Sequence, residues 1–594
     1  MPKSSRPARK PAATLPEWNL GHLYAGPEAP ALKADLKRVR DRAQAFGRSF
    51  KGRIADLDGA AVGAAIADYE AITELLWRIS SYAQLLFASD KSDAKIAKFY
   101  QTILEELNDV SKETLFFTLE INRLDDAVLA RQMKDPAAAR FAPWIRDLRA
   151  FKDHELSDEL ERLFHEKSVT AGSAWVRLFD ETLAAARFPV AGKSLTLSEG
   201  LNLLSHRDPK RRRAAGLAVG RGLGEKSRLF GLVFNTLIKD KAIEDDWRHY
   251  PRPISYRNLS NYVEDEVVDA LIGAVKSSYK DLGHRYYRLK AKWLGVKRLA
   301  SWDRLAPLPD ADDRRYAWPE AKELVLSAYR GFEPTLADLA DQFFAGRWID
   351  AAPRAGKDSG AFCHSTVPSV HPYVLLNFHG RARDVATLAH ELGHGVHQML
   401  AASQGTLMAS TPLTLAETAS VFGEMLAFQA MLDRETNPKR RRVLLASKVE
   451  DMLNTVVRQI AFCEFETRLH AERKTGELLP ERIGEIWLDV QSESLGPAFR
   501  FDEDYRHYWS YVSHFVHSPF YVYAYAFGDC LVNSLYALFR SSHPGFQAKY
   551  LDMLRAGGTK RHKELLAPFG LDAGNPGFWR QGLGVISGFI DELS

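Results

Sequence analysis

The sequence has few cysteines, no long apolar run and no excess of charge of either sign, and each absence excludes a class of protein. Three cysteines among 594 residues, an odd number, do not form the disulfide framework of a secreted protein. No stretch of 18 apolar residues occurs, which argues against a membrane span. The 80 basic and 76 acidic residues nearly balance, so we expect no nucleic-acid or membrane partner. Together these features indicate a cytoplasmic protein.

Helical periodicity dominates the rest of the sequence. Residues 1–14 are basic and rich in proline and alanine but have no apolar core, so we expect a disordered tail and not a secretory signal. Over 31–131 and 156–186, apolar residues recur every three or four positions with charges between them, as in amphipathic helices. We predict a helical N-terminal lobe over residues 15–200 and a catalytic lobe over residues 201–594.

Strand-like segments are short. The segment 187–197 has turn residues between β-favouring runs and predicts a hairpin. Two further strands are predicted at 361–366 and 373–378, in a proline-rich region. The fold class that follows is mostly α with a small β-sheet.

Residues 390–394 read His-Glu-Leu-Gly-His, the H-E-x-x-H pattern of zinc peptidases. Residues four apart lie on one face of a helix, so His390 and His394 can ligate one ion, and Glu391 can reach a water at that ion as its general base. His397 lies on the same face but about 10 Å along the axis from His390, too far to share the ion. The alternative is a chance match in a solvated helix, and the apolar neighbours of the motif argue against it.

A catalytic zinc has three protein ligands and one open position, so a third ligand must come from outside this helix. The next helical segment offers Glu417 and Glu424, two turns apart on one face. Glu417 has an alternative role, because Thr414-x-x-Glu417 has the pattern of a capping box. Glu424 also has an alternative role, as an ordinary surface carboxylate. Spacing alone leaves the third ligand open.

Aromatic residues gather near the C-terminal end. The segment Tyr505–Phe527 has ten of them in 23 positions, where the overall 11% predicts two or three. His507, His514 and His517 are interleaved. One interpretation is an aromatic core wedge, but so many hydroxyl and imidazole groups would each need a buried partner. The wall of a peptide-binding groove satisfies them better.

Several of these stretches together resemble one known family. The zinc motif followed 23 residues later by Glu417, with Gly360-Ala-Phe-Cys363 and Pro372-Tyr-Val-Leu-Leu-Asn-Phe378 upstream, is similar to the thimet oligopeptidase family of zinc metallopeptidases, oligoendopeptidase F branch. The likeness is most specific over residues 360–525. It implies a two-lobed, zincin-type helical fold with a small β-sheet beside the zinc helix and a deep substrate channel.

The resemblance also implies the roles of individual residues. Glu417 becomes the third ligand of one Zn²⁺ per chain, beside His390 and His394. In the family a histidine and tyrosines of the aromatic segment stabilise the oxyanion, and the matching positions here are His514 with Tyr523 and Tyr525. The alignment around them is loose, so the choice among Tyr521, Tyr523 and Tyr525 stays open.

The expected activity is the hydrolysis of internal bonds of short peptides, with Glu391 as base. The alternatives are a related zinc carboxypeptidase or dipeptidyl carboxypeptidase, and a non-catalytic peptide-binding protein. The sequence gives neither the cleavage preference nor the oligomeric state.

Overall fold

The computed structural model describes residues 15–309 and 314–594, so the tail predicted over residues 1–14 lies outside the described residues. Helices make up 70% of the described residues and strands 3%, which confirms the mostly α fold class. None of the described helices combines the length and the apolar character needed to cross a membrane.

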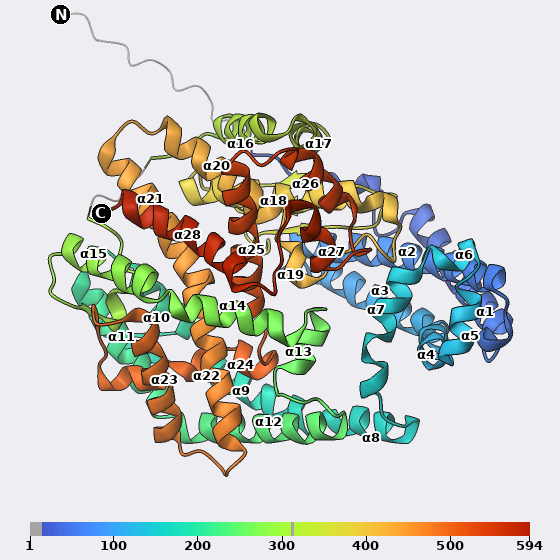
Figure 1. Ribbon diagram of the computed structural model, residues 1–594, viewed down its shortest axis with the longest axis horizontal. Helices are drawn as coiled ribbons and strands as arrows, with labels where there is room; N and C mark the ends of the chain where they lie inside the picture. Colours follow the sequence, from blue (N-terminus) through green and yellow to red (C-terminus); the bar gives the residue numbers. More distant parts are fainter. Residues whose placement is uncertain (1–14, 310–313) are drawn as a thin grey trace, which may run out of the picture.

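The first helices gather at one end of the molecule, drawn in blue in Figure 1. They are α1 (Pro30–Phe50), α2 (Gly59–Ser89), α3 (Ala94–Lys112), α4 (Leu115–Arg123), α5 (Asp126–Gln132), α6 (Pro136–Ala139) and α7 (Ala142–Leu148). The chain then runs through helices that lie across the lower part of Figure 1, from α8 at the lower right to α15 at the left. These are α8 (Asp158–Ser168), α9 (Gly172–Ala185), α10 (Leu197–Asn202), α11 (Pro209–Gly224), α12 (Ser227–Trp247), α13 (Ser255–Ser260), α14 (Asp265–Ser277) and α15 (Arg285–Trp293).

The remaining helices complete the molecule. They are α16 (Trp318–Phe332), α17 (Pro334–Ala345), α18 (Ala382–Ala401), α19 (Leu413–Ala416), α20 (Ser420–Arg434), α21 (Pro438–Thr455), α22 (Val457–Arg473), α23 (Pro480–Leu495), α24 (His514–His517), α25 (Tyr523–Arg540), α26 (Phe546–Arg555), α27 (His562–Leu566) and α28 (Pro576–Glu592). Many begin at a capping residue. At α11, for example, Asp208 accepts the backbone N–H of Lys210 and Pro209 fills the first turn, as its preset backbone angle favours.

The strands of the described residues form three small sheets. They are β1 (Phe188–Val190), β2 (Lys193–Leu195), β3 (Leu299–Ala300), β4 (Ile349–Asp350), β5 (Phe362–His364), β6 (Tyr373–Leu375) and β7 (Phe499–Arg500). β1 and β2 pair antiparallel, which confirms the hairpin, and β3 pairs with β7. The sheet beside α18 has the order β4-β6-β5, so β5 is an edge strand. Both predicted strands are confirmed there, although each is shorter than predicted.

Two large cores fill the molecule. One gathers apolar residues between Trp18 and Ile145, and the other gathers residues from Phe179 onwards. β6 lies between them, because Tyr373 belongs to the first core and Val374 to the second. This is the alternation of side chains expected of a strand. The boundary between lobes at residue 200 stays a prediction.

Candidate active site

Helix α18 presents the two histidines of the motif on one face and buries the opposite one. Leu388, Leu392 and Val396 are completely buried on the core side. The imidazole rings of His390 and His394 lie one turn apart, with centroids 5.0 Å from each other. The helical period thus brings the two histidines together, as the spacing predicts.

Glu417 approaches both histidines from the turn that precedes α20. Its Oε2 lies 3.3 Å from Nε2 of His390 and 3.5 Å from Nε2 of His394. Ligands at 2.0–2.1 Å in tetrahedral geometry are about 3.4 Å apart, so both of these separations match those around a Zn²⁺ ion. Ligating atoms of the three residues all lie within 4.8 Å of one another. The donor set and its geometry therefore fit a zinc ion.

The other ring nitrogen of His390 is held by an acceptor. Nδ1 of His390 lies 3.2 Å from Oε2 of Glu424. An acceptor at Nδ1 keeps the proton on that atom and leaves the lone pair of Nε2 free for a metal. The surroundings thus select the tautomer that can ligate.

Glu424 is in turn held by a buried cation. Nζ of Lys448, on α21, lies 2.6 Å from Oε1 of Glu424. Burial alone would raise the pKa of Glu424, but Lys448 and His390 together lower it to about 2. Glu424 is therefore a charged group facing His390 and not a surface carboxylate. Sequence reasoning missed Lys448, although a lysine between the apolar positions Leu445 and Val449 was a signal.

Glu417 is fixed by its own neighbours. The buried Ser420 hydroxyl donates to Oε2 of Glu417 at 2.6 Å. The capping-box alternative does not occur, because Thr414 donates its hydroxyl to the carbonyl of Asn261 instead. Gly393 permits the close approach of the two segments: a Cβ there would lie 2.5 Å from the carbonyl oxygen of Ala419. The glycine of the motif thus has a packing reason.

Glu391 lies beside the ligands with only 6% of its surface exposed. Burial raises the pKa of Glu391 to about 7, while the neighbouring His390 and a hydrogen bond from the Cys363 backbone act in the opposite direction. A carboxyl group with a pKa near the working pH can both accept and release a proton, as a general base requires. The Cys363 contact also shows that edge strand β5 borders this site.

The aromatic segment brings His514 and two tyrosines together. Nε2 of His514 lies 3.2 Å from the hydroxyl of Tyr525, and the rings of Tyr521 and Tyr525 are 5.3 Å apart. Tyr525 lies one turn before Gly528 on α25, and a Cβ at Gly528 would lie 3.2 Å from Cβ of Glu417. This packing connects the tyrosine to the candidate metal-ligating group.

The structure does not bring Tyr523 to this cluster. Its ring is completely buried, and Asn261 donates a hydrogen bond of 2.8 Å to its hydroxyl. Residues two apart on a helix point to nearly opposite sides. A side chain in the core has no access to a peptide, which leaves Tyr521 and Tyr525 as the tyrosines beside His514.

Two histidines on one helix turn, a carboxylate from the next helix and a neighbouring glutamate base together define a metallopeptidase site. Comparisons with known proteins agree. Residues 202–585 match the profile of Peptidase family M3, and residues 120–188 match that of Oligopeptidase F. The chain belongs to peptidase family M3.

Individual relatives match nearly end to end. The chain is 24% identical to Oligopeptidase PepF of Bacillus subtilis, covering 96% of this chain and 85% of the relative. It is 26% identical to an oligoendopeptidase F homolog of Borreliella burgdorferi, covering 94% of each. A crystal structure from Chlamydophila abortus superposes with a TM-score of 0.87 at 22% identity, over 97% of both chains. That likeness shows the fold alone.

Proposed function

We propose that the protein is a zinc-dependent endopeptidase of the oligoendopeptidase F branch of the thimet oligopeptidase family, and that it cleaves internal bonds of short oligopeptides. The observation that carries the proposal is the close set of ligating atoms from His390, His394 and Glu417, with the carboxyl of Glu391 beside it. The relatives named oligopeptidase and oligoendopeptidase F support the substrate class.

The positions of the site residues suggest a separate role for each in hydrolysis. A zinc ion held by His390, His394 and Glu417 would supply Lewis-acid chemistry, polarising the scissile carbonyl and lowering the pKa of a water. Glu391 accepts a proton from the attacking water and passes it to the amine that leaves. Glu424 and Ser420 hydrogen-bond to the ligating side chains, so they position the ligands and take no direct part in the hydrolysis.

Tyr525 and His514 would stabilise the negative charge that develops on the carbonyl oxygen. A phenol hydroxyl and an imidazole N–H are hydrogen-bond donors of the kind that an oxyanion requires. The sites of His514 and Tyr525 agree with this role because they contact each other and Tyr525 lies near Glu417. We assign no catalytic role to Tyr523.

Edge strand β5 supplies a place for the peptide backbone. Among the described strands, its outer edge has no partner, so an extended peptide can add to it as a further strand. The expected deep channel, the cytoplasmic location and the single zinc per chain stay predictions.

The decisive experiment digests a mixed peptide library and identifies the products by mass spectrometry. The wild type should cleave internal bonds, including those of peptides blocked at both ends, and Glu391→Gln should reduce the rate on the order of 10²–10⁴-fold. Trimming only from free C-termini would instead support a carboxypeptidase. No turnover by the zinc-loaded protein would support a peptide-binding protein.

A further inference from the structure

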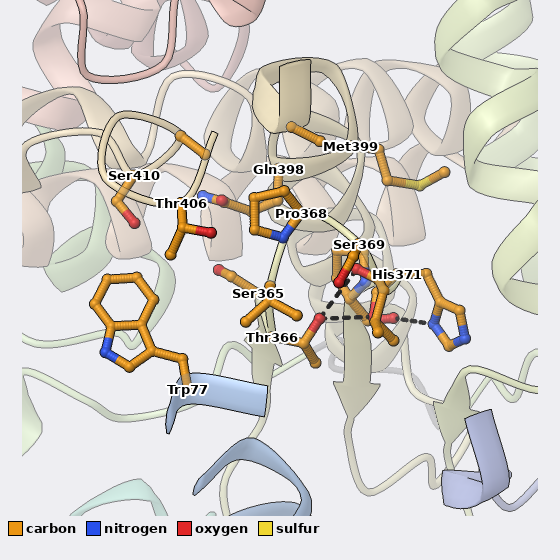
Figure 2. A pocket seen from close by; sticks show the side chains of 15 residues that line it. Trp77, Ser365, Thr366, Pro368, Ser369, His371, Gln398, Met399, Thr406 and Ser410 are labelled. Atoms are coloured by element: carbon orange, nitrogen blue, oxygen red, sulfur yellow. Dashed lines mark hydrogen bonds between the residues drawn. The ribbon is translucent and has the colours of Figure 1, made fainter. Parts of the chain in front are cut away.

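A cavity of about 230 Å³ lies just beyond the metal-ligating residues. Figure 2 shows that its walls come from four parts of the chain: Trp77 on α2, the loop 365–372 that follows β5, the end of α18 with Gln398 and Met399, and the segment with Thr406 and Ser410. It therefore continues from the edge strand that borders the site.

The distance to the metal site follows from helix geometry. Gln398 lies one turn and Ala402 two turns beyond His394, about 6 to 12 Å along the axis. An extended peptide advances about 3.3 Å per residue. A peptide that is paired with β5 and cleaved at the metal site would thus place a side chain two to four residues from the cleaved bond in this cavity.

The lining has no formal charge. Of the described residues that line the cavity, none is Asp, Glu, Lys or Arg. Among these lining residues, His371 is the one with a side chain that titrates between about pH 4 and 8. Burial lowers the pKa of His371 to about 4, so it is neutral near pH 7. Trp77 lines this cavity and leaves 44% of its surface exposed, so a bound group can reach its ring. An exposed tryptophan in an uncharged hollow beside an active site suits an apolar partner.

The loop wall is held in one shape. Thr366 has φ of +55°, a left-handed conformation that β-branched residues rarely adopt. Its buried hydroxyl donates to the carbonyls of Val370 and His371 at 3.2 and 2.9 Å, drawn as dashed lines in Figure 2. The His371 ring stacks on Trp348 at 3.7 Å. Such strain persists where the surroundings fix it, and it clusters at binding sites.

We propose that this cavity is a specificity subsite that receives an aromatic or large aliphatic side chain of the substrate, and that Trp77 provides its main contact. The bound side chain lies two to four residues from the cleaved bond, on the side that faces the C-terminal end of α18. This inference rests on the proposed peptidase function. It adds a preference that the metal site alone does not provide.

The test uses a set of internally cleaved peptides in which one position at a time is Phe, Leu, Ala, Asp or Lys. The wild type should cleave the peptides with Phe or Leu at one position of this window about 10- to 100-fold better in kcat/KM than those with Asp. Trp77→Ala should remove most of that preference, mainly through KM, and leave preferences at other positions unchanged. The matched control is Trp247→Ala on α12, a tryptophan that is 51% exposed.

A second variant tests the subsite by gain of a preference. Gln398→Glu keeps the shape of the side chain and adds one negative charge, so it should raise cleavage of the peptide with Lys at that same position. An unchanged preference in Trp77→Ala, or no gain for Lys in Gln398→Glu, would overturn the subsite while the peptidase stands. If the wild type cleaves none of the peptides, the proposed function fails instead.

Discussion

Lys448 offers the sharpest test of how the metal site is held. Its ammonium is buried, with 7% of the side chain exposed, and lies 2.6 Å from the Glu424 carboxylate. That carboxylate accepts from Nδ1 of His390. Lys448→Met keeps the length of the side chain but removes the cation, so Glu424 is left buried beside His390 without its counter-charge.

Two magnitudes follow from this arrangement. Breaking a buried ion pair from one side costs about 3–5 kcal/mol in the free energy of unfolding, because an uncompensated charge remains. Loss of a group that orients a ligating histidine typically weakens metal affinity about 10- to 100-fold. We therefore expect Lys448→Met to lose both stability and zinc affinity.

The control separates these two losses. Lys290 is likewise buried, with none of its side chain exposed, and its Nζ lies 2.5 Å from Oε1 of Glu450. Lys290→Met should lose a comparable amount of stability but keep its zinc affinity, because neither residue of this pair contacts the metal-ligating group. The measurement is the zinc dissociation constant of each variant, obtained by chelator competition under conditions in which both variants are folded. Equal zinc affinity in the two variants would refute the reasoning.

Three further predictions follow from single contacts. Gly393→Ala should lower zinc affinity at least about 10-fold, because its Cβ would push against Ala419 and move Glu417. The control Gly273→Ala, whose Cβ would have nothing within 4 Å, should leave zinc affinity unchanged and add about 0.5–1 kcal/mol of stability. Equal zinc affinity in the two variants would contradict this. Tyr525→Phe should reduce kcat on the order of 10²-fold with little change in KM. The control Tyr523→Phe should cost about 1 kcal/mol of stability and keep kcat. A change confined to KM in Tyr525→Phe would make Tyr525 a binding residue. Glu466→Gln should raise the melting temperature, and more at pH 8 than at pH 5. Burial raises the pKa of Glu466 from 4.5 to about 8. Between pH 4.5 and pH 8 the folded protein therefore keeps a proton that the unfolded chain has released, and the stability of the wild type falls as the pH rises. The same gain at both pH values would argue against a protonated buried carboxyl.

The candidate metal site was largely predictable because its main constraint is local. The four-residue spacing of His390 and His394 determines their common face once the segment is helical. Glu417 was one of two candidates from spacing, and only the resemblance favoured it. The structure adds why it reaches both histidines: the close packing at Gly393 brings the start of α20 against α18.

The tyrosines were harder because their orientation depends on where a helix begins. α25 begins at Tyr523, so Tyr523 turns to the core, whereas Tyr525 faces His514 and Tyr521. A shift of one residue in the expected start changes which side chain faces the peptide. Lys448 was missed for a different reason: its partner Glu424 lies 24 residues away, and a distant pairing leaves no periodic signal.

β6 explains why the two cores act as one scaffold for the site. Tyr373 and Leu375 pack into the N-terminal core, while Val374 between them packs into the core that contains α18. β5 pairs with β6, and its Phe362 contacts Trp18 near the start of the described chain. Removal of the N-terminal helices would expose one face of β6 to water and loosen β5, the strand proposed to bind the peptide backbone. Under the proposed function, the N-terminal helices therefore position the substrate edge of the site as well as Trp77, and the candidate metal ligands alone would not make a complete peptidase.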